Sequence, residues 1–251
     1  MMRRAFTLVE LSVVLVVIGL LIGGIIAGKA LIQGSEVKNL ARQALSIQTA
    51  FLSFRDQYGY LPGDYPKAVS LWGTDTYGCP SNNNQTPRKT TCNGDGDGKL
   101  NTAESFHAWQ HLADAGLISG SFTGENNDST GSGSYLPGVN MPATKRANVG
   151  IHVIYWNLSP LAGNLMMIGG KSSGGILTSS NAALTTQEAY LLDQKYDDSL
   201  PQTGLINIIL YSASPFGTCT AGTNAYNTAA DGLNTAAFSP GCAMVWQWES
   251  Q

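Results

Sequence analysis

Charged residues are scarce in this chain, and no basic excess accompanies them. Asp, Glu, Lys and Arg make up 12% of the 251 residues, and the formal net charge is −3. This balance lacks the electrostatic footprint of a nucleic-acid-binding domain, so no nucleic acid is expected as a partner. Because 43% of the residues are hydrophobic, the composition also excludes a chain that is disordered throughout.

Catalytic signatures are also missing. No Ser/His/Asp or Cys/His arrangement can be singled out, and the GKS within residues 169–175 has Leu165 where a phosphate-binding loop needs its first glycine. His107 and His111 lie four apart on an expected helix, a spacing that can bind zinc, but no Glu follows the first and no third ligand is apparent. We interpret them as solvent-facing or capping side chains. Nothing in the sequence supports an enzyme, and we expect none.

Charge is absent altogether from one stretch near the N-terminus. Between Leu11 and Gly28 no residue carries a charge, and these 18 residues are enough to cross roughly 30 Å of hydrocarbon. Glu10 stands at the head of this stretch, where an ionisable group close to lipid needs a reason. One interpretation is a secretory signal peptide, with a basic start and a small-residue cleavage site near Ala30.

The apolar pattern continues beyond this stretch as a helical face, which favours a different interpretation. Apolar residues alternate spacings of three and four at Val37, Leu40, Ala44, Ile47, Phe51, Phe54 and Tyr58. We therefore expect one helix over residues 6–58, roughly 80 Å long at about 1.5 Å per residue. Its first half, about residues 6–28, would be transmembrane, and its second half would pack on a globular head. Gly59 supplies a stop.

Residues 3–24, RRAFTLVELSVVLVVIGLLIGG, resemble the N-terminus of type IV pilins and of the pseudopilins of type II secretion systems. The shared motif is a small residue, then Phe-Thr-Leu-x-Glu, then an apolar run after a short basic leader. The resemblance implies that a prepilin peptidase removes a leader of residues 1–5 by cutting between Ala5 and Phe6, and methylates the new amino group of Phe6. It also implies that Glu10 pairs with the amino terminus of a neighbouring subunit, where low dielectric strengthens an ion pair.

The head, residues 59–251, contains four apolar or alternating runs of strand length. They are residues 149–158, 164–170, 204–213 and 242–249, and they predict an antiparallel sheet. Residues 184–204 predict a helix and a Pro-Gly turn. The packed face of that helix is expected at Leu184, Ala189 and Leu192. The expected fold class is α+β: a long N-terminal helix packed on an antiparallel-sheet head.

The segment CNGDGDGKLNTAES matches the twelve-residue calcium loop over residues 93–104. A hard cation takes six to eight oxygens, and alternate residues of a tight loop converge on one point, with Gly98 at the bend. The expected calcium ligands are Asn93, Asp95, Asp97, the backbone carbonyl of Lys99, Asn101 and Glu104. A helix is expected directly after the loop, with Phe106, Trp109, Leu112 and Ala113 inward. The alternative is a polar turn that binds no metal.

The four cysteines allow three pairings, and an exported head favours disulfides. We expect the two local pairs, Cys79 with Cys92 and Cys219 with Cys242. The first would brace the calcium loop, and the second would tie down the C-terminal region, as in many pilins. The absence of a CxxC motif argues against a metal site at these cysteines.

The resemblance implies a structural subunit of a type IV pilus or a type II secretion pseudopilus. Such a subunit is anchored in the inner membrane by a single span, with a periplasmic or extracellular head. An inner-membrane assembly platform then moves it into a filament with other pilin or pseudopilin subunits. The size of the head favours a minor or tip subunit. The alternative is an exported, membrane-anchored calcium-binding module that does not polymerise, and Glu10 separates the two because only assembly gives its carboxylate a role.

Overall fold

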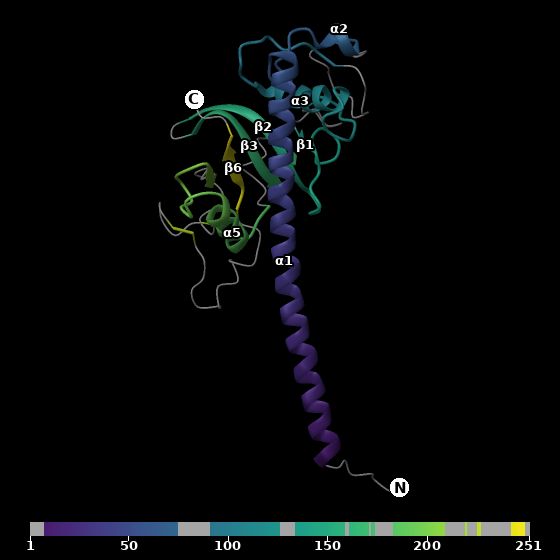
Figure 1. Cartoon of the computed structure of the whole chain (residues 1–251), viewed down its shortest axis with the longest axis vertical. Helices are drawn as coiled ribbons and strands as arrows, with labels where there is room; N and C mark the ends of the chain where they lie inside the picture. The colour runs from purple at the N-terminus through teal and green to yellow at the C-terminus, as the bar shows by residue number, and fades with distance from the viewer. Residues whose placement is uncertain are drawn as a thin grey trace.

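One helix, α1 (Leu8–Tyr58), runs as a single 51-residue element from the first described residue into the head (Figure 1). The computed structural model describes residues 8–74, 91–125, 134–158, 161–170, 172–173, 183–208, 219, 225–226 and 242–248. The helix ends where Gly59 takes a φ of +79° and donates its N–H to the Arg55 carbonyl at 2.8 Å. The predicted stop at Gly59 is therefore confirmed.

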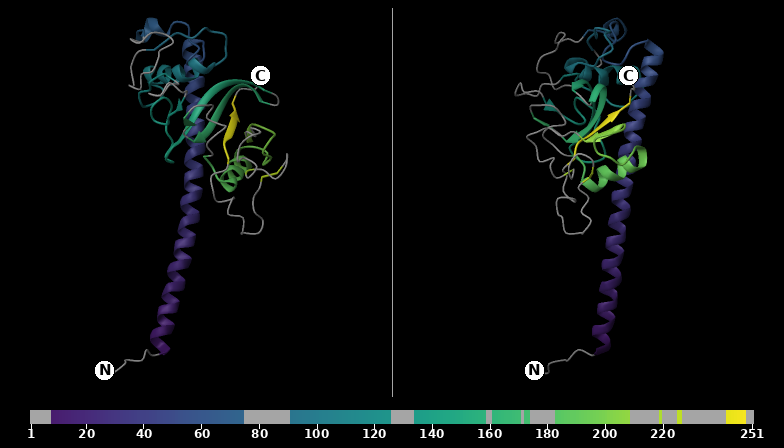
Figure 2. Two further views of the ribbon diagram at one scale, coloured as in Figure 1. Left: turned by 180° about the vertical axis from the view of Figure 1, so that it is seen from behind. Right: turned by 90° about the vertical axis from the view of Figure 1, so that its left-hand side faces the viewer.

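The two halves of α1 have different surroundings. The segment Leu8–Ile25 has a mean hydropathy of 2.7 and is 0% buried, and the views of Figure 2 show this part of the helix projecting away from the head. A helix of this length and composition can cross a membrane, either as an anchor or as a signal sequence. The second half buries the predicted stripe at Val37, Leu40, Ala44, Ile47, Phe51 and Phe54. Tyr58, the last predicted member, is only half-buried.

The head is built on a four-stranded antiparallel sheet in the order β2–β3–β6–β5. β2 (Val149–Leu158) and β3 (Leu161–Gly170) pair along their full lengths, with Val149 opposite Gly170. β6 (Met244–Gln247) and β5 (Ile206–Ile208) complete the sheet. A separate two-stranded pair joins β1 (Ser134–Tyr135) to β4 (Ser172–Ser173).

Most of the expected strands are confirmed, and one differs in extent. The expected run at residues 204–213 contributes the three-residue strand β5, and residues 209–213 lie outside the described part of the chain. Gly204 has a φ of +73°, so it belongs to a turn that precedes the strand. The fold is α+β, as expected: a long helix beside an antiparallel sheet that carries further helices.

Within the described residues, three shorter helices lie around this frame: α2 (Ala68–Trp72), α3 (Thr102–Asp114) and α5 (Thr186–Tyr196). α3 and α5 both begin with a capping box, in which the N-cap side chain and a glutamate three residues later satisfy each other's backbone N–H groups. In α5 these residues are Thr185 and Glu188. The expected faces of both helices are confirmed as buried, with Ala113 half-buried.

The core is continuous where α1, α3 and the sheet meet. Phe51 is fully buried, and its ring centroid lies 5.6 Å from that of Trp109 on α3 and 5.3 Å from that of Trp248, just after β6. Both contacts are edge-on, a favourable arrangement of aromatic rings. Phe51 therefore joins the long helix to two other elements of the head.

A polar contact joins α1 to α5 on another side of the head. Arg146 donates to Glu36 of α1 at 3.0 Å and to Glu188 of α5 at 2.8 Å. These two carboxylates and their hydrogen bonds raise the pKa of the guanidinium above its ordinary value, with the bond to Glu188 the largest cause. Arg146 also donates to the carbonyl of Ala183 at 2.8 Å, so it fixes the entry to α5.

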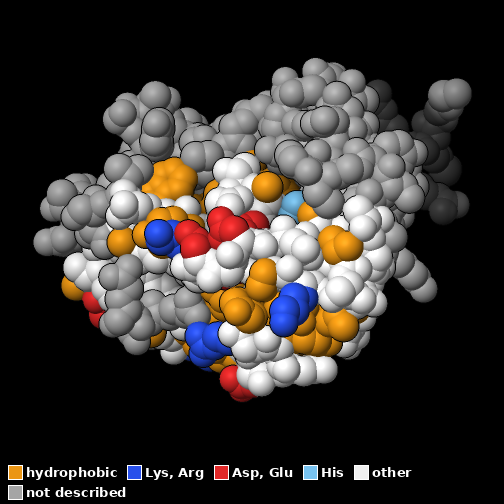
Figure 3. Space-filling model, turned by 90° about the horizontal axis from the view of Figure 1, so that it is seen from above, with side chains coloured by type: hydrophobic (Ala, Val, Ile, Leu, Met, Phe, Trp, Pro, Cys, Tyr) orange, Lys and Arg blue, Asp and Glu red, His pale blue; other side chains and the backbone are white. Residues whose placement is uncertain are grey.

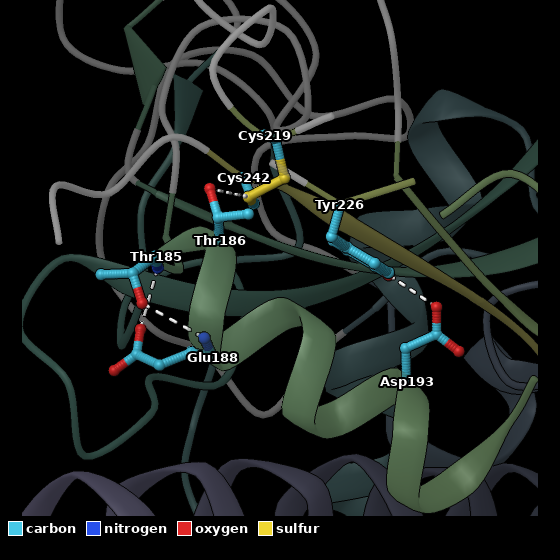
Figure 4. The surroundings of a disulfide bond; sticks show 7 residues. All are labelled: Thr185, Thr186, Glu188, Asp193, Cys219, Tyr226 and Cys242. Atoms are coloured by element: carbon cyan, nitrogen blue, oxygen red, sulfur yellow. Dashed lines mark hydrogen bonds between the residues drawn. A yellow bond between two sulfur atoms is a disulfide. The ribbon is translucent and has the colours of Figure 1, made fainter. Parts of the chain in front are cut away.

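The expected disulfide between Cys219 and Cys242 is present, with the two Cα atoms 5.4 Å apart. Figure 4 shows it above the start of α5, where the Cys242 sulfur lies beside Thr186 at 3.8 Å. Cys242 exchanges backbone hydrogen bonds with Leu184, so the bridge ties residue 219 to the entry of both α5 and β6. Cys79 lies outside the described residues, and the pairing of Cys79 with Cys92 stays a prediction.

Candidate functional site

Four carboxylates gather at the end of the molecule where α1 stops. They belong to Asp64, Asp95, Asp97 and Glu104, and each offers an oxygen within 4.8 Å of the others. Figure 3, which views this end from above, shows acidic side chains gathered in one group. Three of the four were expected from the loop pattern. Asp64, from the turn after α1, was not.

The loop after Asn93 has the expected tight conformation. Asp95 Oδ1 accepts the Asp97 N–H at 3.0 Å, and Asp97 Oδ1 accepts the Lys99 N–H at 2.8 Å. Gly96 and Gly98 have φ values of +79° and +81°, a conformation that glycine adopts without steric cost. These two glycines let the alternate side chains turn to the same side of the backbone.

Glu104 connects the loop to α3. Its Oε1 accepts the Asp95 N–H at 2.9 Å, its Oε2 accepts the Asn101 N–H at 3.2 Å, and the residue is 4% exposed. The pKa of Glu104 is raised to about 7, chiefly by burial and to a smaller extent by the nearby charges of Asp95 and Asp64, against the two backbone hydrogen bonds, which lower it. A bound cation would relieve this accumulation of negative charge.

The two asparagines expected as ligands have other contacts. Asn93 Oδ1 accepts the Val69 N–H of α2 at 2.8 Å, and Asn101 Oδ1 caps α3 by accepting the N–H groups of Ala103 and Glu104. The Lys99 carbonyl accepts the Asn101 N–H at 3.2 Å. Their roles as ligands therefore stay predictions.

Two open hollows border the carboxylates. One, of about 330 Å³, is lined by Asn93, Asp95, Asn101, Glu104 and His107, among others. The other, of about 370 Å³, is lined by residues that include Asp64, Asp97 and Gly98. Asp95 and Glu104 therefore border one hollow and Asp97 the other, and each hollow has room for a cation with water molecules.

The interpretation of His107 and His111 as solvent-facing or capping residues is wrong. They are 5% and 0% exposed, because loops and strands cover α3 on almost every side rather than on one face. Burial lowers the pKa of His107 to about 4 and that of His111 to about 3, so both rings are neutral at physiological pH. Neither could have been recognised as buried from helical periodicity alone.

His111 holds together the two segments that carry the site. Its Nδ1 accepts the Gly63 N–H at 2.7 Å, so Nε2 carries the proton and donates to the Cys92 carbonyl at 3.1 Å. Gly63 precedes Asp64, and Cys92 precedes Asn93. A histidine on α3 thus fixes the spacing between the turn after α1 and the start of the loop.

A second acidic group, made of Asp193, Asp197 and Asp198, lies at the end of α5. Asp193 accepts a hydrogen bond from Tyr226 Oη at 2.7 Å (Figure 4), and Asp197 accepts the Ile206 N–H at 2.6 Å. Asp198 accepts the Leu200 N–H at 2.8 Å. Local protein donors account for this group, so we assign no cation to it.

Comparisons with known proteins return no matching family model, no similar curated protein and no similar solved structure. The resemblance of the N-terminal residues to pilins and pseudopilins therefore remains a prediction. The function has to be inferred from the long helix and the carboxylate site.

Proposed function

We propose that this chain is a pilin-like structural subunit of a type IV pilus or type II secretion pseudopilus, with a minor or tip position favoured by the size of its head. The observation that carries this proposal is α1. One uninterrupted helix leaves the mostly apolar 18-residue segment Leu8–Ile25 uncovered and buries its other half in the head. Such a helix suits a subunit that is held in the inner membrane first and packed into a helical bundle later.

The proposed partners follow from this assembly. A prepilin peptidase would cut between Ala5 and Phe6, and an inner-membrane platform would add the subunit to others of the pilin or pseudopilin type. The head would be periplasmic or extracellular. A membrane-anchored calcium-binding module that does not polymerise is the second candidate. The same helix would anchor such a module, but Glu10 would then have no role in assembly.

Processing gives the first test. Intact-mass and N-terminal peptide mass spectrometry of the mature protein is expected to find N-methylated Phe6 as the first residue, without residues 1–5. A control strain that lacks prepilin peptidase should retain the unmodified precursor. A mature protein that starts near Ala30 would show that the stretch is a secretory signal and would overturn the proposal.

We also propose that the carboxylate site binds calcium. The donors that converge there are oxygens, the ligands that hard divalent cations prefer, and burial together with the neighbouring carboxylates raises the pKa of Glu104, which a bound cation would reverse. Asp95, Asp97 and Glu104 would hold the ion, with Asn93, Asn101 and the Lys99 carbonyl available around it. The ion would neutralise the cluster and stiffen the loop.

Calcium removal gives the second test. Because only the folded loop gathers the ligands, calcium at a hundredfold excess over Kd should add about 2.7 kcal/mol to the free energy of unfolding. For a chain of this size that is roughly 5–10 °C in Tm. Chelator should lower the Tm of the detergent-solubilised full chain by this amount.

A double substitution provides the control. Asp95→Ala with Asp97→Ala should melt like the chelated wild type and should not respond to calcium. Asp56→Asn, which removes an exposed charge near the end of α1, should respond like the wild type. If calorimetry detects no binding at millimolar calcium and chelator leaves the Tm unchanged, the loop is a polar turn.

A further inference from the structure

We propose that Asp64 is a ligand of the cation bound at the 93–104 loop, and that the cation thereby ties the end of α1 to the loop and to α3. This inference rests on the calcium site proposed above. It adds a ligand from outside the twelve-residue pattern, and it gives the ion a role at the junction between the long helix and the head.

Asp64 is held against the loop by close backbone contact. A Cβ added at Gly94 would collide with the backbone of Asp64 and Gly63, and the Gly94 N–H donates to the Tyr65 carbonyl at 3.0 Å. Gly63 has a φ of +91° and also lacks room for a Cβ beside the Glu104 carbonyl. Asp64 is 1% exposed. The turn after α1 therefore fits into the loop rather than lying over it.

The Asp64 carboxylate faces the inside of the loop. Oδ1 accepts the N–H groups of Gly96 at 2.6 Å and Asp97 at 3.1 Å, and Oδ2 accepts the Gly98 N–H at 2.9 Å. An ionised carboxylate has about four acceptor positions, so one position on Oδ2 remains. The same carboxylate offers an oxygen within 4.8 Å of those of Asp95, Asp97 and Glu104.

His107 gives an independent indication that the hollow beside Asp95 and Glu104 holds a ligand. It is 5% exposed, and its Nδ1 is buried without a hydrogen-bond partner among the described residues. Its side chain lines the hollow of about 330 Å³ beside Asp95 and Glu104. Asp64 and Asp97 line the neighbouring hollow of about 370 Å³, and all four carboxylates offer oxygens within 4.8 Å of one another. Buried ring nitrogens almost always have a partner, because burying one alone is unfavourable. A water molecule bound to a cation between the carboxylates would supply that partner.

Geometry also explains why Asp64 should matter for rigidity. Asp95, Asp97 and Glu104 connect the loop only to itself and to α3, whereas Asp64 lies a few residues beyond Gly59, where α1 ends. A cation shared by all four carboxylates would cross-link the end of α1 to the loop. Calcium concentration would then set how firmly the long helix is attached to this end of the head.

The competing explanation is that Asp64 only anchors the loop through its three N–H bonds. Asp64→Asn removes the charge but keeps the shape and one acceptor oxygen; because its NH2 group cannot accept the N–H bonds on its side, hydrogen exchange of the wild type completes the separation of the two explanations. We would compare full-length wild type, Asp64→Asn and the charge control Asp56→Asn in detergent, by calorimetric calcium titration and by melting with calcium and with chelator.

We expect Asp64→Asn to weaken calcium affinity at least tenfold and to lose most of the calcium-dependent rise in Tm, whereas Asp56→Asn should match the wild type. If wild type binds calcium and Asp64→Asn binds it equally well, the inference is overturned even when the variant is less stable. If wild type binds no calcium, the proposed calcium site itself fails.

A measurement on the wild type covers the case in which Asp64→Asn does not fold. Hydrogen exchange followed by mass spectrometry should show that calcium protects peptides from residues 59–66 as well as those from residues 93–104. Protection confined to residues 93–104 would show that the turn after α1 takes no part in binding.

Discussion

Glu10→Val is expected to leave the precursor inserted and cleaved but to reduce its incorporation into filaments at least tenfold. Valine makes the apolar stretch more apolar, so insertion into the membrane should not suffer. In the proposed assembly the carboxylate pairs with the amino terminus of a neighbouring subunit. Removing one partner of a buried ion pair leaves the other charge uncompensated, at a cost of about 3–5 kcal/mol.

Glu10 has a second possible role that predicts a much smaller effect. It lies in the first turn of α1, where a negative charge interacts favourably with the positive end of the helix dipole. That interaction contributes only about 0.3–1 kcal/mol at an exposed terminus. A role confined to the helix end would therefore leave assembly largely intact after substitution.

Two variants make the Glu10 experiment specific. Ser12→Val makes a nearby position of the same segment apolar without touching the carboxylate, and it should assemble normally. Glu10→Asp keeps the charge on a shorter side chain and should retain part of the incorporation into filaments. The readout is immunoblotting of sheared filaments and of membranes from a strain without the wild-type copy. Normal incorporation of Glu10→Val there would contradict the assembly role and favour the non-polymerising alternative.

Local patterns in the sequence predicted the long helix and most of the sheet. The 3.6-residue period of α1 works because one side of the helix faces the head, so burial and spacing coincide at Val37 through Phe54. The strands β2 and β3 were recognisable for a similar reason, since long apolar runs of strand length mark buried strands. The disulfide between Cys219 and Cys242 followed from the local pairing of cysteines.

Only the residues of the candidate site that lie close together in the sequence could be predicted. Asp95, Asp97 and Glu104 belong to one short pattern, but Asp64 lies 31 residues before Asp95, and only tertiary packing brings it into the loop. The one sequence signal that could have pointed to Asp64 is an acidic residue directly after Gly63 in a tight turn. A glycine turn with one aspartate is too common to single out without the fold.

α3 shows why helical periodicity failed for the histidines. Every residue from Glu104 to Leu112 is buried, because α1, β2 and the segments around residues 63 and 92 cover the helix together. A prediction from helical periodicity assumes that one face of the helix is buried and the other is exposed to water. When a short helix is enclosed, polar side chains such as His111 and Gln110 instead serve as internal hydrogen-bonding partners.

Phe51→Ala is expected to destabilise the head by about 3–5 kcal/mol, the usual cost of removing a fully buried phenylalanine ring. The ring is 0% exposed and contacts Trp109 and Trp248, so its loss opens a cavity where α1, α3 and the end of β6 meet. For a chain of this size the Tm should fall by roughly 6–20 °C. The cavity cannot collapse easily because both tryptophans are held by other elements.

Leu45→Ala is the matched control for Phe51→Ala. Leu45 lies on the same helix, is 38% exposed, and its replacement keeps a strong helix former, so its effect should stay within about 1 kcal/mol. Circular dichroism of the full chain in detergent would follow melting, with tryptophan fluorescence reporting the packing around Trp109 and Trp248. The apolar half of α1 should stay helical in micelles after the head has melted, because Leu8–Ile25 is 0% buried in the described structure. If Phe51→Ala melts within a degree or two of Leu45→Ala, the second half of α1 is not part of the core of the head, and the attachment of helix to head must be reassigned.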